Sequence, residues 1–487
     1  MTIDSAGERV RFSNVLMGEV WVCAGQSNME WPLSASDSWN SETFGSEIRQ
    51  DFRPVDSPIA ESLDDGRNNS TGRAAQSSYD QSQLRLLHLI GGARGSSGSY
   101  TRQHLSCLTP ESFCEGRWRM ASAESARDFS AVAWFFGKHL QQNLKVPVGV
   151  ICPAVGGTPT EAWIPRESLE SDAELKGLVA GNWLDNERLG EFCRTRGVQN
   201  LLAAMQAGES IPADDGGPNH PFKPGFMWEA GIQPLIPYAI RGAIWYQGES
   251  NAETPDRVRE HTRLFPLLIH SWRQHWGQGD FPFLYVQLPA LNRPEWPLFR
   301  EGQRRLLGEL DNVGMAITID TGHPSNVHPT WKRPVGERLA KWALGTTYMN
   351  AVVEAATLRG TDAGTQPLAS PSLYSGPLFD SAQRKDGMLV LRFQHSGNRL
   401  KSSDGKGLRH FEVCGDDGIF HPASAKVIEK HSIALTSPNV ANPRHARYAW
   451  LPWPDPPVNL FNSANLPASP FSTQSADPVF SPDRLSH

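Results

Sequence analysis

A serine near the start of the chain, Ser27, has the setting of a catalytic nucleophile. It follows the apolar run 20–24 and the residues Gly25 and Gln26. A short apolar run that stops at a glycine is typical of a buried strand, and open α/β sheets place their ligands at the carboxyl ends of such strands. A helix cap or a turn is the alternative role for a serine there. Met29 stands where Gly-x-Ser-x-Gly needs its second glycine, so that motif is not matched.

Two further segments carry groups that can stabilise negative charge beside such a serine. Gly156 and Gly157 follow the apolar run 148–152, and adjacent glycines let the backbone approach a ligand and point an N–H group at it. Gln247 follows the run 243–246, and its amide can donate to an oxyanion without changing charge. The alternatives are an ordinary turn for the glycines and, for Gln247, a buried amide that satisfies backbone groups.

A fourth segment, 320–329, offers a base. It contains His328, and histidine is the usual general base near neutral pH. Any one of the 15 histidines is more often structural. The loop that carries His328, however, is predicted to leave the sheet at the same edge as the other three segments. Glu249 and Asn251 are predicted to order the loop that follows Gln247. A nucleophile, a base and oxyanion donors at one edge are what acyl transfer from an ester requires.

The elements that must position these residues alternate between strands and helices. The predicted helices show apolar residues along one side, as a period of 3.6 requires. This alternation predicts a parallel sheet with helices on both faces. The predicted strands are 20–24, 84–90, 148–152, 243–246, 283–288 and 315–319, and the predicted helices are 131–144, 257–276 and 334–344.

The composition and the hydrophobic pattern of the sequence change at two places. Segment 34–83 is rich in Ser, Asp, Asn and Gly without a sustained period, which predicts a long, partly mobile insertion above the sheet edge. From residue 351, short strand candidates separated by Gly, Asp and Asn turns predict an antiparallel β module. These strand candidates are 389–393, 410–413, 425–428 and 432–436, and a Pro/Ser-rich tail follows from residue 460.

The composition bounds the class of protein and its partners. With 487 residues, 39% hydrophobic and 20% charged, the chain is typical of a soluble globular protein of two or three domains. A net charge of −6 without a basic run argues against nucleic acid as the partner. No window of 18 uninterrupted apolar residues predicts a membrane span.

The cysteines and histidines predict neither a disulfide framework nor a metal site. Six cysteines form no disulfide framework at this length, and Cys23 and Cys152 are predicted as buried thiols. Cys107 and Cys114 bracket a loop, where a disulfide is the less favoured alternative to two thiols. The chain has no CxxC or HExxH spacing, so no metal site is predicted.

Long blocks of the sequence resemble a known family. The segments GEVWVCAGQSNMEW, DFSAVAWFFGKHL, VPVGVICPAVGGTPTEAW, PYAIRGAIWYQGESNA, PFLYVQL and HPTWKRPVGERLAKWAL are similar to the sialate O-acetylesterase family, a branch of the SGNH hydrolases. In the β module, GLRHFEV, SPNVANPRHARYAW and LPASPF also fit. The similarity runs from Gly18 into this module. It implies a flavodoxin-like three-layer α/β/α SGNH hydrolase domain over 18–350 and a β-rich module and tail over 351–487.

The resemblance also implies roles for the four segments. Ser27 would be the nucleophile and His328 the base of an acyl-enzyme mechanism that needs no cofactor. The N–H groups of Ser27, Gly156 and Gly157, with the amide of Gln247, would form the oxyanion hole. The implied substrate is an acetylated sugar, with a sialate 9-O-acetyl ester as the family's example. An acetylxylan or other polysaccharide deacetylase, and an inactive sugar-binding module, are the alternatives.

Three departures from the family pattern bear on these roles. SGNH enzymes often carry an Asp three residues before the catalytic histidine, where this chain has Ser325. Asp320 or a main-chain carbonyl is left to orient His328, and a Ser-His dyad is the alternative. Segment 227–231 reads MWEAG where the family tends to have a Tyr-Asn-Gly-Met-like stretch, which puts the exact substrate in doubt.

The third departure lies at the N-terminus. Relatives usually carry a secretion signal and a β-rich segment before the GEVW block, whereas only 17 residues precede it here. Residues 1–17 are therefore predicted to be a remnant strand of a shortened N-terminal segment. The chain as written predicts a cytoplasmic location, and a truncated start would predict an exported one.

Some of the 16 tryptophans are expected to bind sugar. Trp31, Trp163 and Trp245 are the candidates, with core packing as the alternative for each. Glu249 and Asn251 are further candidates for contacts with the substrate.

Overall fold

The computed structural model describes residues 2–5, 8–40, 83–349 and 373–474. Most of the predicted insertion 34–83 and the predicted domain break near residue 350 lie outside these residues. None of the helices in the described part is long and apolar enough to cross a membrane.

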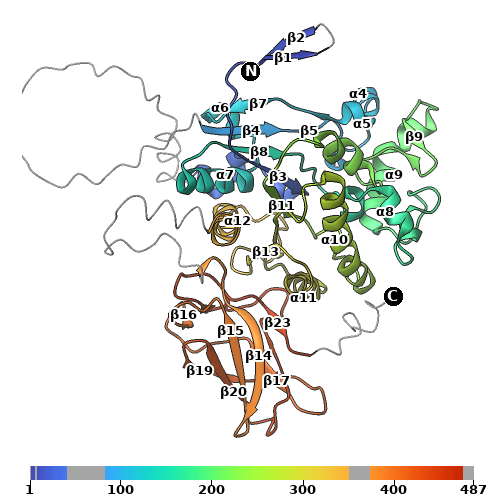
Figure 1. Cartoon of the computed structure of the whole chain (residues 1–487). Helices are drawn as coiled ribbons and strands as arrows, with labels where there is room; N and C mark the ends of the chain where they lie inside the picture. Colours follow the sequence, from blue (N-terminus) through green and yellow to red (C-terminus); the bar gives the residue numbers. More distant parts are fainter. Residues whose placement is uncertain (1, 6–7, 41–82, 350–372, 475–487) are drawn as a thin grey trace, which may run out of the picture.

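A seven-stranded sheet forms the centre of the larger part of the chain (Figure 1). Six of its strands are parallel, and only β7 runs antiparallel, against β4. The predicted α/β class is confirmed. In spatial order the strands are β13 (Val313–Ala316), β12 (Phe283–Val286), β11 (Gly242–Tyr246), β3 (Glu19–Gly25), β8 (Val148–Cys152), β4 (Leu84–His88) and β7 (Trp118–Met120).

The order of the parallel strands differs from that of flavodoxin. Numbered along the chain, they lie in the order 2-3-1-4-5-6, whereas flavodoxin has 2-1-3-4-5. The chain leaves β3 towards one edge of the sheet and leaves β11 towards the other, so the carboxyl ends of these neighbouring strands flank the switch point. Gly25 pairs with Tyr246 there. This is the place at which open α/β sheets bind ligands.

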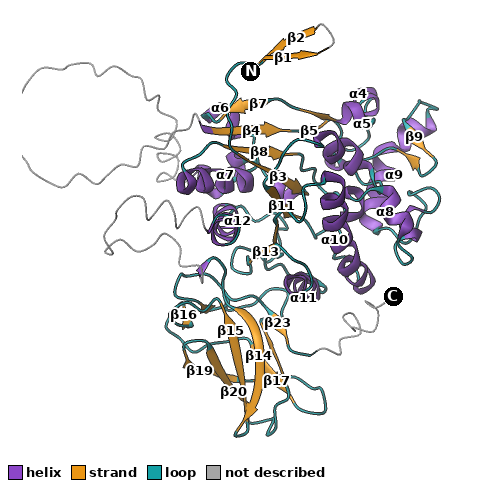
Figure 2. Ribbon diagram, viewed as in Figure 1, coloured by secondary structure: helices purple, strands orange, loops and turns teal. Residues whose placement is uncertain are grey.

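Helices cover both faces of the sheet, as Figure 2 shows. On one face the ring of Phe136 lies 5.1 Å from that of Trp21 in β3. On the other face the ring of Trp245 in β11 lies 6.3 Å from that of Phe265. The helices are α7 (Ala131–Leu144) and α12 (Arg333–Gly345) on the first face, α10 (Pro255–Trp276) on the second, and α9 (Glu191–Gln206) and α11 (Trp296–Arg305) at the periphery.

The three predicted helices match α7, α10 and α12, and the predicted strands match within a few residues. The largest shift is in the last strand, predicted at 315–319 and found as β13. Its pairing with β12 ends at Ala316, and the residues after it turn towards α12, where Arg338 donates to the carbonyl of Ile317.

The C-terminal part forms antiparallel sheets, as the sequence predicts, and two of these sheets have four strands each. The rings of Phe379 and Phe471 stack between them, 4.6 Å apart. Gln287 donates to the hydroxyl of Ser469 at 2.9 Å, which ties this part to the end of β12. The sheets are β14 (Leu378–Lys385), β15 (Met388–Gln394), β20 (Ser432–Thr436) and β19 (Ser424–Glu429), and β18 (His421–Pro422), β17 (Phe411–Cys414), β21 (His445–Tyr448) and β23 (Phe471–Ser472).

Shorter elements complete the described chain. They include the helices α1 (Ser27–Glu30), α2 (Asp37–Asn40), α4 (Arg102–Ser106), α5 (Pro110–Phe113), α6 (Ala123–Arg127) and α8 (Arg166–Ser171). Two-stranded pairs are β1 (Thr2–Ser5) with β2 (Glu8–Arg11), β5 (Ile90–Gly91) with β6 (Cys114–Glu115), β9 (Ala213–Asp214) with β10 (Gly217–Pro218), and β16 (Lys401–Ser402) with β22 (Leu460–Phe461). All six cysteines are free thiols, Cys107 and Cys114 among them.

Candidate active site

Ser27 and His328 meet at the carboxyl edge of the sheet. His328 Nε2 lies 2.8 Å from Ser27 Oγ, within hydrogen-bond distance. Ser27 starts the short helix α1 directly after β3, and His328 lies in the loop between β13 and α12. Both residues line a cleft of about 460 Å³. Two residues that lie 301 positions apart in the chain thus have the mutual geometry that a nucleophile and a general base require.

The ring of His328 is positioned by its neighbours. It stacks on the indole of Trp31, with ring centroids 5.3 Å apart and an interplanar angle of 24°. The backbone N–H of His328 donates to Asn326 Oδ1 at 2.9 Å, which fixes the loop. Burial lowers the pKa of His328, and the positive charges of Lys332 and Arg293 lower it further. The imidazole therefore stays neutral, and able to accept a proton, below the usual histidine pKa.

The structure does not bring Asp320 to the histidine. Both carboxylate oxygens of Asp320 accept hydrogen bonds from Arg338, at 2.6 and 2.7 Å. No hydrogen bond joins Asp320 to His328 in the described part of the chain. Asp320 is therefore engaged by Arg338 and does not orient His328.

A buried polar network joins helix α1, which Ser27 starts, to the loop that carries His328. Asn28 Nδ2 donates to Glu249 Oε1 at 2.5 Å and to the carbonyl oxygen of Val327 at 2.9 Å. Lys332 Nζ donates to Asn28 Oδ1. Since Val327 directly precedes His328, the Asn28 side chain fixes the backbone of the base relative to Ser27.

Lys332 is a fully buried lysine. Its Nζ atom lies 5.7 Å from the ring centroid of Trp31 and 5.4 Å from that of Tyr246, within cation–π range of both. Burial lowers the pKa of Lys332 to about 7, against the opposing effect of Glu249. Burial likewise raises the pKa of Glu249.

One of the predicted oxyanion donors, Gln247, is fully engaged elsewhere. Its Nε2 donates to the carbonyl of Thr158 at 3.3 Å and to Asn251 Oδ1 at 2.6 Å. Its Oε1 accepts from Thr160 Oγ1 at 2.6 Å. Gln247 is therefore the alternative stated above, a buried amide that satisfies the hydrogen-bonding groups of its neighbours.

The remaining predicted donors are backbone N–H groups. That of Gly156 donates to Glu30 Oε2 at 2.8 Å. Those of Ser27 and Gly157 make no hydrogen bond within the described part of the chain. Gly157 has a φ of +81°, a conformation that glycine adopts without strain, so this turn favours glycine at position 157.

The structure places one of the predicted substrate-binding residues in the cleft and the other four in the interior. Trp31 lines the cleft. Trp163 and Trp245 are 0% and 1% exposed and pack edge to face with ring centroids 5.7 Å apart, so they belong to the core and present no face to a sugar. Glu249 and Asn251 are buried as well. Their predicted role in ordering the loop agrees with their contacts, whereas a direct substrate contact does not.

Several cleft residues are missed by the sequence reasoning. Glu30 lines the cleft, and its Oε1 lies 2.9 Å from Arg94 Nη2. Burial raises the pKa of Glu30, opposed by Arg94 and the Gly156 N–H. Glu30 comes three residues after Ser27, the spacing that puts both on one side of a helix, and this signal could have found it. Arg94 and Asp128 come from loops whose course the sequence does not reveal. His88 is the last residue of β4, so its place at the carboxyl end of a predicted strand was a signal that could have found it.

Known proteins resemble this chain along most of its length. The family described as carbohydrate esterase, sialic acid-specific acetylesterase, matches residues 228–345. Human sialate O-acetylesterase is 26% identical over 500 residues, which cover 96% of this chain and 77% of the human protein. The mouse sialate O-acetylesterase is 27% identical over 505 residues, 97% of this chain and 80% of its own.

A solved structure agrees with these relatives. The crystal structure of a carbohydrate acetylesterase from Xanthomonas citri superposes on this chain with a TM-score of 0.67 at 27% identity. The match covers 97% of this chain and 84% of the chain in that crystal structure. The matches agree on one class of protein, the carbohydrate esterases. Within that class, the resemblance to the sialate O-acetylesterase family predicted from the sequence motifs is confirmed.

Proposed function

We propose that the protein hydrolyses O-acetyl esters of sugars through a covalent acetyl-enzyme on Ser27. The observation that carries this proposal is the distance of 2.8 Å between His328 Nε2 and Ser27 Oγ in a cleft at the sheet's carboxyl edge. The similarity to carbohydrate acetylesterases supports the choice of an acetylated sugar as the substrate.

In the first half of the reaction, Ser27 Oγ attacks the acetyl carbonyl carbon while His328 Nε2 takes the hydroxyl proton. The oxyanion that forms accepts hydrogen bonds from the free N–H groups of Ser27 and Gly157. Collapse of this intermediate breaks the ester bond, and the departing sugar oxygen takes the proton from His328. The acetyl group stays on Ser27.

In the second half, His328 takes a proton from a water molecule that attacks the acetyl-enzyme. Collapse returns the proton to Ser27 Oγ and releases acetate. The imidazolium forms twice in this cycle, and no carboxylate among the described residues is hydrogen-bonded to the His328 ring. Instead, the Trp31 ring and the hydrogen bond from Asn28 to the Val327 carbonyl hold the His328 ring in position.

An acetate-release assay tests the proposal. The wild type is expected to release acetate from a chromogenic acetyl ester and from an acetylated sugar, and Ser27→Ala to lose this activity. Asp320→Asn serves as a matched control, because the structure pairs Asp320 with Arg338 and not with the histidine. Equal rates for wild type and Ser27→Ala, or no activity in either, would favour an inactive sugar-binding protein.

A further inference from the structure

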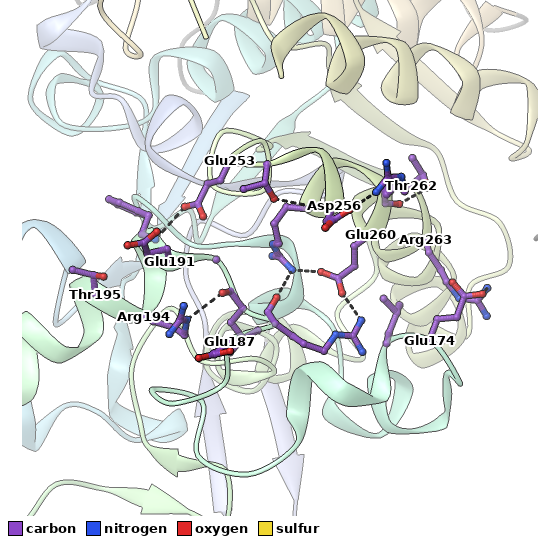
Figure 3. Close-up of a pocket in the computed structure, with 18 of the residues that line it drawn as sticks. Glu174, Glu187, Glu191, Arg194, Thr195, Glu253, Asp256, Glu260, Thr262 and Arg263 are labelled. Atoms are coloured by element: carbon purple, nitrogen blue, oxygen red, sulfur yellow. Dashed lines mark hydrogen bonds and ion pairs between the residues drawn. The ribbon is translucent and has the colours of Figure 1, made fainter. Parts of the chain in front are cut away.

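A second cavity, larger than the cleft of Ser27, shares no lining residue with it. It has a volume of about 1060 Å³ and lies between the start of α9, the first turns of α10 and the loop before α9 (Figure 3). Glu187, Glu191, Arg194, Glu253 and Asp256 are among its lining residues. Neither Ser27 nor His328 lines it. The proposed reaction leaves this space without a role.

The Gly156–Gly157 turn separates the cavity from the cleft. A Cβ atom on Gly156 would lie 3.4 Å from Ser27 Cβ, and one on Gly157 would lie 3.5 Å from the ring of Phe192. Phe192 lines the cavity. Ser250 Oγ donates to the Gly157 carbonyl at 3.0 Å and fixes the turn. The near end of the cavity is therefore one turn of backbone away from the nucleophile.

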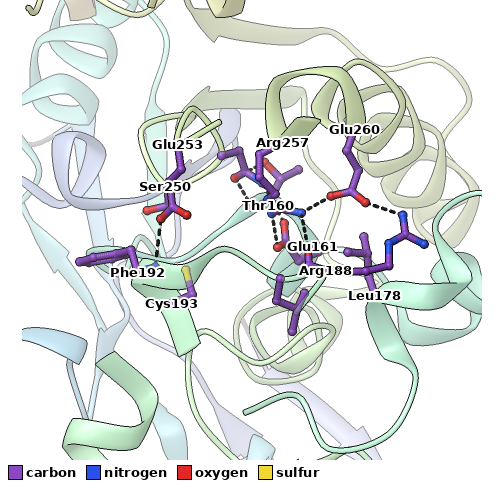
Figure 4. Close-up of polar contacts among 12 residues, drawn as sticks. Thr160, Glu161, Leu178, Arg188, Phe192, Cys193, Ser250, Glu253, Arg257 and Glu260 are labelled. Atoms are coloured by element: carbon purple, nitrogen blue, oxygen red, sulfur yellow. Dashed lines mark hydrogen bonds and ion pairs between the residues drawn. The ribbon is translucent and has the colours of Figure 1, made fainter. Parts of the chain in front are cut away.

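A buried ionic cluster lies beside the cavity, and two of its members, Arg257 and Glu260, line it (Figure 4). Arg257 Nη2 lies 2.5 Å from Glu161 Oε1, and its Nη1 pairs with Glu260. Glu161 Oε2 in turn accepts from Asn251 Nδ2 at 2.9 Å. Asn251 binds Gln247, so the cluster is continuous with the network behind the cleft. A preformed lining lowers the entropic cost of binding a ligand.

The charges of the cavity indicate the class of its ligand. The lining contains seven arginines and seven acidic residues. Such a balance gives no net attraction for a polyanion, and the charged lining suits no apolar molecule. A neutral ligand rich in hydroxyl groups can donate to the carboxylates and accept from the guanidinium groups. Glu187, Glu191 and Arg196 form no ion pair with another described residue and are available for such contacts.

Phe192 adds an aromatic surface at the near end. It is 44% exposed although it sits in the first turn of α9. The guanidinium carbon of Arg196 lies 5.8 Å from its ring centroid, and Glu253 Oε1 accepts from its backbone N–H at 3.3 Å. An exposed ring flanked by hydrogen-bonding side chains presents an apolar face together with polar partners, which matches the apolar faces and hydroxyl edges of a pyranose ring.

We propose that this cavity binds the sugar units next to the acetylated one, so that the substrate is an acetylated oligosaccharide or glycan chain and not a free acetylated monosaccharide. The acetylated unit would lie at Ser27, and the chain would pass over the Gly157 turn onto Phe192. This inference rests on the proposed esterase function and names the substrate class of that same site.

Matched substrates test the inference. Acetate release is compared for acetylated xylose and acetylated xylo-oligosaccharides, and for 9-O-acetyl sialic acid free and at the end of sialyllactose. The expected result is a higher kcat/KM for the oligosaccharide of at least one pair. Phe192→Ala is expected to lower that preference about fivefold, mainly through KM, and to leave hydrolysis of a small chromogenic acetate unchanged.

Leu202→Ala is the matched control, because Leu202 lies on the same helix, is also 44% exposed and does not line the cavity. Glu253→Gln is a second variant that keeps the side-chain shape. Calorimetric titration of Ser27→Ala with xylohexaose and with sialyllactose measures the affinity of the cavity for the sugar in the absence of catalysis. Adding Phe192→Ala to the Ser27→Ala variant is expected to weaken this binding.

Two failures are distinguishable. A wild type without activity on any acetyl ester overturns the proposed function, while the titrations still test the cavity. A wild type that is active but shows no oligosaccharide preference, or a Phe192→Ala variant that behaves like Leu202→Ala in both rates and titrations, overturns the inference and leaves the esterase function standing.

Discussion

The cleft at Ser27 and the network behind it contain the same kinds of residue, but they use them differently. Ser27, Glu30 and His328 line the cleft. In the network, Gln247 donates to Asn251 and Thr158 and accepts from Thr160, and Asn251 donates to Glu161, so little hydrogen-bonding capacity remains on either side chain. A polar motif at the end of a parallel strand thus predicts a position near the site. It does not predict whether the side chain faces the substrate.

The largest effect is expected for Ser27→Ala. Removal of the nucleophile is predicted to lower kcat by at least about 10³-fold while the free energy of unfolding changes little. A steady-state assay on a chromogenic acetyl ester and urea denaturation measure the two quantities. A variant that keeps more than a tenth of the wild-type rate would remove Ser27 from the chemistry.

For the network, Glu161→Ala is expected to act on stability. It takes from buried Arg257 one of its two carboxylate partners and from Asn251 an acceptor. Loss of such a partner costs about 3 kcal/mol, which urea denaturation would detect. Glu161→Gln keeps the shape and an acceptor oxygen and is expected to cost less. Equal unfolding free energies for wild type and Glu161→Ala would show that Glu161 does not stabilise the cluster beside the cavity.

Gln247→Ala tests the comparison itself. If the amide stabilised the oxyanion, its loss would lower kcat on the order of a hundredfold. The hydrogen bonds to Thr158, Thr160 and Asn251 predict instead a loss of stability of about 1–3 kcal/mol and a fall in kcat of less than about tenfold. The kcat of the folded variant, measured well below its melting temperature, separates the two. A hundredfold loss in kcat would place Gln247 in the cleft after all.

The smallest effect is a shift in the pH dependence of Lys332→Met. His328 acts as a base only when neutral, so kcat/KM falls as the pH drops through its pKa. The charge of Lys332 helps to lower that pKa, and its removal is expected to raise the pKa and move the acidic limb of the profile upward by less than about one pH unit. Arg293→Gln, which removes a charge outside the Asn28 network, is expected to shift the limb in the same direction. An unmoved limb in both variants would contradict the assignment of His328 as the titrating base.

Much of the fold follows from local pattern. The helix 131–144 and the strand 148–152 were predicted with the bounds that α7 and β8 have, because a one-sided apolar period and a short buried run are local signals. The strand order was not predictable in this way. The placement of β8 between β4 and β3 depends on crossovers that carry no local signal.

The candidate site shows the same limit. That Ser27 and His328 share an edge follows from the rule that parallel strands end together. The pairing of Asp320 with Arg338 depends on α12, and the occupation of the Gly156 N–H by Glu30 depends on the turn of α1. Such contacts are set by tertiary packing, so sequence reasoning named a candidate orienting acid and an oxyanion donor that the structure commits elsewhere.

The most direct test of the dyad is the site of covalent labelling by a fluorophosphonate, which reacts with activated serines. After digestion, mass spectrometry is expected to find the adduct on the peptide that contains Ser27 in the wild type. His328→Ala is expected to label far more slowly, and Asp320→Asn at the wild-type rate. An adduct on a different serine, or an active enzyme in which Ser27 stays unlabelled, would contradict the account.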